Sequence, residues 1–354
     1  MKNIRFNYSV LLILFFFFSI NLFSEDFEGG KKVSKGDRLE VSATNGNIIV
    51  NVWDKDEVYV KAKNLDAEDV KEFSFKQTGG IVSLKFKGQN SNNFSLEFSI
   101  PSYIILDFST GGGNISIKGN LNGLVKIATG GGNITLNDIR NTLSISTGGG
   151  NIIVGTVSDK AEISTGGGEV KVESALKKLD VSTGGGNISV GSIGGKAEIS
   201  SGGGNISIGN VSAGIEISTG GGNIKLDGAN GNVEVTTGGG NISLKNVKGL
   251  IDATSGSGNI ELSFDPPAGS YSEVTTGNGN ITLFIPETAK TLVKANFLVW
   301  KYSDKNPRIH LYSDFDGVTY DTNNMEMNAE LKLNGSGSTI ELNVTSGEIF
   351  IKKR

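Results

Sequence analysis

The sequence contains no cysteine, only five prolines and a single histidine among 354 residues. The absence of cysteine excludes disulfides, thiolate metal sites, cysteine nucleophiles and lipid attachment through an N-terminal cysteine. The one histidine, His310, has no neighbour in the sequence that would indicate a catalytic group. A net charge of −4 gives no long-range attraction to nucleic acid, which is therefore not expected as a partner.

Glycine, in contrast, is abundant, with 51 residues. It follows no three-residue period, which excludes a collagen-like chain. Hydrophobic residues make up 37% of the chain, enough for a packed core. This composition is typical of a β protein that is rich in turns.

The N-terminus is typical of an export signal. Lys2 and Arg5 precede an uncharged apolar run at residues 10–18, and an acidic pair follows. We predict a signal peptide over residues 1–24, cleaved after Ser24, and no transmembrane span after its removal. The protein is then exported to the periplasm, to the outer surface or into the medium. The apolar run is shorter than the roughly 20 residues of a membrane span, and a signal that is kept as an anchor is the alternative.

A short motif, Thr-Gly-Gly-Gly-Asn or a close variant, recurs along the middle of the chain. From Thr129 to Ser255 each step between successive copies is 18 residues. Self-similarity at a fixed period indicates a solenoid and takes precedence over local propensity. The copies begin at Thr110, Thr129, Thr147, Thr165, Thr183, Ser201, Thr219, Thr237 and, in degraded form, Ser255 and Thr276.

Each unit contains two short strands and two turns. Aliphatic residues alternate with Ser, Lys, Glu or Asn, the pattern of a strand with one buried face. The alternation changes phase inside the glycine run and again between Ile208 and Val211, which marks two corners. We therefore predict an all-β fold, a single-stranded parallel β-solenoid (β-helix) of 18-residue coils with atypical terminal caps. A right-handed coil is favoured because parallel crossovers usually have this hand, and a left-handed coil stays open.

The glycine runs are interpreted as corners of the solenoid. Glycine permits a tight turn or a close backbone approach without a Cβ clash. The asparagine that follows each run then stacks from coil to coil, where its amide can form hydrogen bonds along a ladder. The predicted turn and ladder residues of three central coils are Gly184, Gly185, Gly186, Asn187, Gly202, Gly203, Gly204, Asn205, Gly220, Gly221, Gly222 and Asn223.

The chain divides into four predicted segments. Residues 1–24 are the signal peptide, and 25–109 form an N-terminal cap with the first irregular coils. Residues 110–285 form the regular solenoid, and 286–354 form a C-terminal aromatic cap with closing strands. Within this last segment, Trp300 and Tyr302 are a candidate ligand surface.

No catalytic, cofactor-binding or metal site is predicted. The glycine runs lack the Lys-Ser/Thr of a phosphate-binding loop. Calcium use stays open, although a hard cation prefers carboxylates to the neutral asparagine found here. Between Thr110 and Gly258 there are 11 Lys/Arg and 11 Asp/Glu, interpreted as scattered over the outward positions. An enzyme built on a carboxylate pair that folding brings together remains an alternative.

Three features of the chain resemble those of a known family. They are the opening Leu39-Glu-Val41 with Asn45-Gly-Asn-Ile-Ile-Val50 and Trp53, the strand-glycine-turn units, and the closing Ile340-Glu-Leu-Asn-Val-Thr-Ser-Gly-Glu-Ile-Phe-Ile351. From about Asp37 to Lys353 the chain resembles the bacterial putative-adhesin family of β-strand-repeat proteins. The resemblance implies an exported β-solenoid, for which adhesion is a label, and it offers no catalytic motif.

We interpret the chain as a noncatalytic cell-envelope or surface protein, an adhesin or scaffold that binds a protein or glycan through its polar faces. The alternative is a carbohydrate-active enzyme, a polysaccharide lyase or hydrolase on a β-helix.

Overall fold

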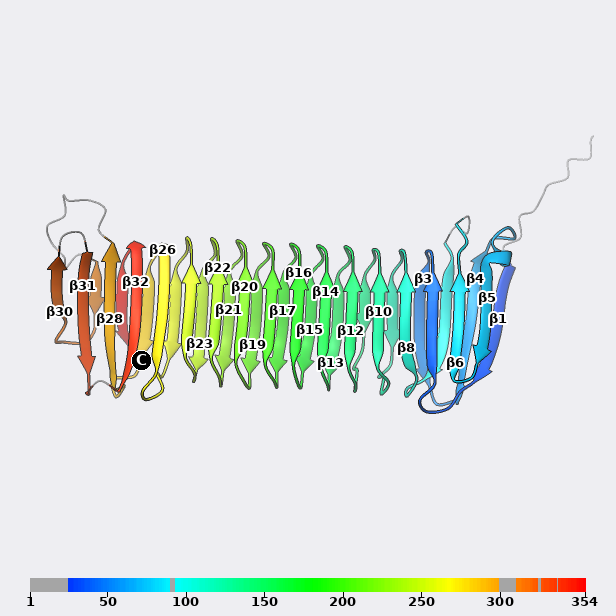
Figure 1. The fold of residues 1–354 in the computed structure, drawn as a ribbon, viewed down its shortest axis with the longest axis horizontal. Coiled ribbons are helices and arrows are strands. Elements are labelled where there is room, and N and C mark those ends of the chain that lie inside the picture. The colour runs from blue at the N-terminus through cyan, green and yellow to red at the C-terminus, as the bar shows by residue number, and fades with distance from the viewer. Residues whose placement is uncertain (1–24, 90–92, 299–309, 324–325, 336) are drawn as a thin grey trace, which may run out of the picture.

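The computed structural model describes residues 25–89, 93–298, 310–323, 326–335 and 337–354, which form a long rod of β-strands (Figure 1). The predicted all-β solenoid is confirmed, while its handedness remains a prediction. The helical structure among the described residues is one 3₁₀ turn, η1 (Val70–Glu72). None of the helical structure there has the length and apolar character of a membrane span. The predicted signal peptide, Trp300 and Tyr302 lie outside the described residues.

The strands form two facing sheets, and sheet A has 16 strands. At about 4.8 Å between neighbouring strands, it extends over about 70 Å. Its strands, in spatial order, are β1 (Glu25–Lys32), β4 (Glu57–Leu65), β7 (Ser95–Pro101), β3 (Asn47–Trp53), β9 (Ile115–Lys118), β11 (Ile134–Leu136), β13 (Ile152–Val157), β15 (Val170–Ala175), β17 (Ile188–Ile193), β19 (Ile206–Val211), β21 (Ile224–Ala229), β23 (Ile242–Val247), β25 (Ile260–Phe264), β27 (Ile281–Ile285), β33 (Ile349–Lys353) and β29 (Leu311–Ser313).

Sheet B holds the other strand of each coil, and its pairings run in one line from β5 to β30. Its strands are β5 (Phe73–Thr78), β6 (Ile81–Phe86), β2 (Arg38–Ala43), β8 (Ile105–Thr110), β10 (Val125–Thr129), β12 (Leu143–Thr147), β14 (Ala161–Thr165), β16 (Leu179–Thr183), β18 (Ala197–Ser201), β20 (Ile215–Thr219), β22 (Val233–Thr237), β24 (Ile251–Ser255), β26 (Tyr271–Asn278), β32 (Ser338–Ser346), β28 (Thr291–Leu298), β31 (Glu326–Leu333) and β30 (Thr319–Asn323).

The 18-residue period of the sequence sets the register of the central strands. Ile188 pairs with Ile206, and Ile206 pairs with Ile224, each in a parallel ladder. Because neighbouring strands carry the same pattern, each aliphatic side chain lies directly over its equivalent in the next coil. The outward side chains stack in the same way, so any residue type that repeats every 18 positions forms a continuous row along the rod.

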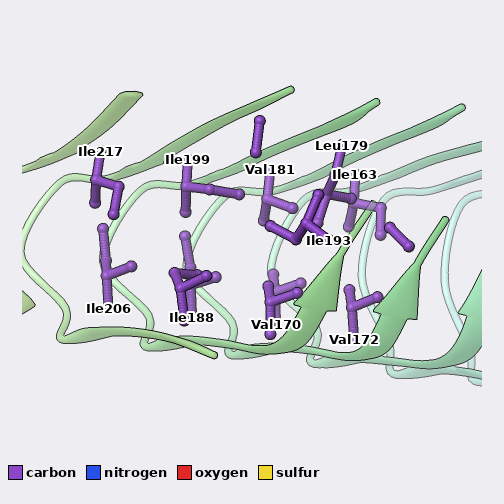
Figure 2. Close-up of a cluster of buried hydrophobic side chains, with 14 of the residues drawn as sticks. Ile163, Val170, Val172, Leu179, Val181, Ile188, Ile193, Ile199, Ile206 and Ile217 are labelled. Atoms are coloured by element: carbon purple, nitrogen blue, oxygen red, sulfur yellow. The ribbon is translucent and has the colours of Figure 1, made fainter. Parts of the chain in front are cut away.

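The core is the narrow space between the two sheets (Figure 2). Ile188 and Ile206 of sheet A point toward Ile199 and Ile217 of sheet B, and all four side chains are buried. Full burial of an aliphatic side chain of this size stabilises the fold by about 1.5–3 kcal/mol. One cluster of buried residues continues from Val33 to Ile351, so the core is continuous along the rod.

The first coil of the chain, β2 and β3, does not lie at the end of the rod. β2 is parallel to both β6 and β8, and β3 is parallel to both β7 and β9. The coil formed by β6 and β7 therefore covers the first coil on its outer side. Antiparallel strands then complete this end, with β4 between β7 and β1 and with β5 on β6.

The last coil, β32 and β33, is inserted in the same manner. β32 lies between β26 and β28, as Figure 1 shows near the end of the rod, and β33 lies between β27 and β29. The antiparallel strands β31 and β30 finish sheet B. The coil of β2 and β3 and the coil of β32 and β33 are thus each held between two other coils, which protects them from fraying.

Candidate functional site

The triple-glycine corners are close-packed against one another. A Cβ on Gly204 would lie 2.0 Å from the carbonyl oxygen of Gly186, one coil earlier, and a Cβ on Gly202 would lie 2.1 Å from that of Gly184. A Cβ on Gly203 would meet nothing within 4 Å. The first and third glycines are therefore required by the approach of the neighbouring backbone, while the middle glycine is not required for space.

The asparagines after these corners form a ladder of side-chain to backbone hydrogen bonds. Oδ1 of Asn187 accepts the N–H of Asn205 at 2.9 Å, and Oδ1 of Asn205 accepts the N–H of Asn223 at 2.8 Å. The same bond joins Asn47 to Asn114 at the first coil and Asn280 to Glu348 at the last coil. At Glu169 the pattern changes, since its carboxylate accepts from the side-chain Nδ2 of Asn187.

The threonine that opens each motif connects two coils inside the corner. Thr183 is 6% exposed, and its hydroxyl donates to the carbonyl oxygen of Gly168 at 2.9 Å. The hydroxyl oxygen of Thr183 also accepts the N–H of Gly186 at 3.2 Å. Ser201 forms the equivalent pair of bonds in the next coil. The polar groups of the corner residues thus form their hydrogen bonds with one another, which indicates a structural role for the corners.

The outward surface of sheet B carries a feature of another kind, a continuous row of carboxylates. Eight acidic residues occupy matching positions on consecutive strands, each directly opposite the next. We call this set the carboxylate row. Its members are Glu162, Asp180, Glu198, Glu216, Glu234, Asp252, Glu273 and Glu341.

The carboxylate row corrects the interpretation that the charges of the array are scattered. Acids and bases are equal in number there, but the acids are concentrated in one row on sheet B. The signal was present in the sequence, because Glu or Asp recurs every 18 residues from Glu162 to Asp252. It is visible only when the units are aligned and compared position by position.

Lysines accompany the first part of the carboxylate row. Nζ of Lys178 lies 2.7 Å from Oδ2 of Asp180, and this contact raises the pKa of the lysine. Lys160 and Lys196 occupy the same place in the two adjacent coils. The negative charge of this part of the row is therefore balanced locally.

The second part of the carboxylate row has no such balance. The position of these lysines is taken by Gly214, Asn232 and Leu250. The ion pairs among the described residues do not include Glu216, Glu234 or Asp252. Like charges placed directly opposite each other on neighbouring strands destabilise a sheet.

A hollow of about 340 Å³ lies over this unbalanced part. Its walls include Glu216, Glu234, Asp252 and Glu273 together with Asn232, Leu250 and Tyr271. The Leu250 side chain is 37% exposed and that of Tyr271 is 51% exposed. The hollow therefore combines several carboxylates with an aromatic ring that is open to solvent.

A second hollow of about 340 Å³ lies further along the same face. Its lining is neutral and rich in amides, with Asn296, Asn328, Asn343 and Thr275 among its residues. Asn343 Nδ2 donates to Glu273 Oε1 at 3.1 Å, which links this hollow to the first one.

A network of hydrogen bonds orders the side chains between the two hollows. The Tyr271 hydroxyl donates to Glu341 Oε2 at 2.7 Å, and this bond, followed by burial, raises the pKa of Tyr271 to about 12. Nδ2 of Asn296 donates to Glu341 Oε1 at 3.0 Å and to Asn343 Oδ1 at 2.8 Å. The amide and carboxylate groups of this surface are therefore already ordered by their mutual hydrogen bonds.

His310 packs its ring near that of Phe297, with 6.3 Å between the ring centroids. Within the described ranges, no three His, Cys, Asp or Glu side chains gather in a way that could hold a metal ion.

Fold and surface together define an all-β solenoid with structural corners and one strongly patterned polar face. The chain belongs to the Toastrack DUF4097 family, whose model matches residues 173–352. This match confirms the resemblance seen in the sequence. No curated protein matches the sequence significantly.

Several solved structures are similar at low sequence identity. A putative adhesin from Bacteroides fragilis NCTC 9343 is 19% identical, with 68% of this chain and 97% of that chain covered and a TM-score of 0.36. A putative adhesin from Parabacteroides distasonis ATCC 8503 is 12% identical, with 94% and 98% covered and a TM-score of 0.33. A putative lipid binding protein from the same organism is 18% identical, with 73% and 96% covered and a TM-score of 0.32.

Proposed function

We propose that this protein is a noncatalytic, exported binding protein of the cell envelope or cell surface, which presents sheet B to a partner. The observation that carries the proposal is the unbalanced part of the carboxylate row, around Glu234. Repulsion between its neighbouring carboxylates destabilises the folded state. Natural sequences commonly keep such destabilising residues at functional positions.

The architecture supports this role in two ways. The continuous core and the hydrogen-bonded corners hold the outward side chains in fixed register over many strands, so a long partner meets a preformed surface. The export signal expected at residues 1–24 would deliver that surface to the envelope or beyond. Adhesion would be one form of such binding.

The decisive experiment compares two charge variants of the exported protein. In the first, Glu216→Gln, Glu234→Gln and Asp252→Asn neutralise the unbalanced part of the carboxylate row. In the matched control, sheet A loses three carboxylates of its own. These control changes are Glu173→Gln, Asp227→Asn and Glu261→Gln.

Binding to isolated envelope fractions and to a glycan array is measured for each protein at low and physiological salt. The proposal requires that the wild-type protein and the sheet A variant bind while the sheet B variant is weakened. Equal binding by all three proteins, or no binding by the wild type, would refute it.

A hydrolytic or lyase activity is the second candidate, because neighbouring strands place carboxylates side by side. All members of the carboxylate row, however, project from one face, whereas glycoside hydrolysis uses two carboxyl groups that flank the bond to be cleaved. Release of reducing ends or unsaturated products from a polysaccharide panel, abolished in the sheet B variant, would favour the enzyme.

A further inference from the structure

The two hollows of sheet B lie on consecutive strands, and we call them together the track. The first spans β20, β22, β24 and β26, and the second spans β26, β32, β28 and β31. These are consecutive strands of the sheet, so the track crosses seven strands and is about 30 Å long. A site of this length suits a linear polymer better than a small molecule.

The two halves of the track differ in chemistry. The half around Glu234 offers unpaired carboxylates beside the exposed Leu250 and Tyr271. The half around Asn343 offers neutral amides and hydroxyls, already oriented by hydrogen bonds. A ligand that fills both halves must therefore carry positive charge and must also be rich in neutral hydrogen-bonding groups.

The spacing of the track argues against an extended basic peptide. Side chains on one face of an extended chain recur about every 6.7 Å, whereas the carboxylates recur at the strand spacing of about 4.8 Å. A cationic peptide would thus lose register with the row within a few residues.

We propose that this track binds a linear glycan with free amino groups. Its ammonium groups lie along the row between Glu216 and Asp252, and a sugar ring packs on Tyr271. Its hydroxyls bond to the amides around Asn343. The assignment rests on the proposed function, in which sheet B is the binding face, and it adds the class of ligand and its position.

The test uses defined oligomers and the whole exported protein. A β-1,4-linked glucosamine hexamer is titrated by calorimetry, with the fully N-acetylated hexamer and an oligolysine as comparison ligands. The variants are Glu234→Gln with Asp252→Asn, Tyr271→Ala, and the sheet A control Glu173→Gln with Glu261→Gln. Thermal unfolding of each variant confirms that it is folded.

The proposal predicts that the glucosamine hexamer binds and that the other two ligands bind at least tenfold more weakly. Since two exposed charge pairs are lost, neutralising Glu234 and Asp252 should weaken binding about tenfold, with no effect of the sheet A control. Tyr271→Ala should weaken it severalfold at every salt concentration, because ring packing is not screened.

Equal binding of oligolysine would show that the track recognises charge alone and would overturn the glycan assignment. Equal binding of the acetylated hexamer would overturn the role of the amino groups. If no hexamer binds while envelope material still binds in a manner that needs the carboxylate row, this inference fails and the proposed function stands. If neither binds, both fail.

Discussion

The backbone N–H of Asn205 donates to the side-chain Oδ1 of Asn187, its equivalent one coil earlier, over 2.9 Å. The bond repeats along the corner edge and passes through both inserted terminal coils, at Asn114 and at Glu348. Its only interruption between these two coils is at Glu169, as far as the described residues show. A missing bond in an otherwise regular ladder offers a direct measure of what one such bond contributes.

Replacing Glu169 with Asn should therefore stabilise the protein. The Asn187 N–H, which has no acceptor among the described residues, would gain Oδ1 of the new side chain, worth about 0.5–1 kcal/mol net. Urea unfolding followed by circular dichroism provides the measurement. Glu169→Gln, whose longer side chain does not reproduce the asparagine geometry, is the control, and an equal gain in both variants would contradict the ladder as the cause.

Two neighbouring glycines should respond in opposite ways to the same substitution. Gly204→Ala places a Cβ 2.0 Å from the Gly186 carbonyl oxygen and should destabilise the fold by about 3 kcal/mol or more. The Cβ added by Gly203→Ala meets nothing within 4 Å. This substitution should be neutral, or should stabilise the fold by up to about 1 kcal/mol because alanine lowers the conformational entropy of the unfolded chain. Thermal unfolding of both variants tests the pair, and similar losses would show that close approach is not what the third glycine provides.

The corner hydroxyl can be tested by a change that preserves its shape. Thr183→Val removes the donor to the Gly168 carbonyl, in a buried place, and the acceptor for the Gly186 N–H, in a partly buried one. Leaving these groups unsatisfied should cost about 2–4 kcal/mol. Thr183→Ser keeps both bonds, as Ser201 does naturally, and should lose much less. A Val variant as stable as the Ser variant would contradict the role given to the hydroxyl.

The core and the corners could be predicted from the sequence because their causes repeat in every unit. The aliphatic positions of Ile188, Ile206 and Ile224 follow from an 18-residue period and a period-two alternation, both of which are properties of neighbouring residues. The glycines and asparagines follow for the same reason. Prediction of the sheets thus required only that identical units stack.

The proposed binding surface could not be predicted in the same way. Tyr271 and Glu341 are 70 residues apart, and they meet only because the last coil is inserted beside β26. No repeat marks that insertion, since β32 lacks the triple glycine. The carboxylate row is hard to predict because a single Glu on an outward position is ordinary, and the row is formed only when equivalent positions of neighbouring strands are brought side by side.

Tyr103 should make the stability of the N-terminal end sensitive to alkaline pH. Burial, together with a 2.8 Å hydrogen bond to Asp56, raises the pKa of this phenol to about 12. A raised pKa means that the stabilisation is complete below the ordinary value near 10 and is lost as the pH rises through about 12. Tyr103→Phe should be less stable than the wild type at pH 8, and the difference should vanish toward pH 12. Urea unfolding across this range tests it, and a difference that does not depend on pH would contradict it.

The carboxylate row should make the folded protein less stable at low salt than at high salt. Glu234 lies directly between Glu216 and Asp252, and the lysine position in these three coils is taken by Gly214, Asn232 and Leu250, so Glu234→Gln should raise the urea midpoint at low ionic strength. Salt should reduce this gain, because mobile ions screen the repulsion in the wild type.

Glu198→Gln is the matched control for this change. Glu198 occupies the same row but lies close enough to Lys178 to help raise the pKa of that lysine. Neutralising Glu198 therefore removes its attraction to Lys178 as well as its repulsion from the neighbouring carboxylates. Its effect on the midpoint should be smaller than that of Glu234→Gln. If the two variants behave alike, or if Glu234→Gln destabilises the protein, then the row does not oppose folding, and the argument that binding maintains it loses its basis.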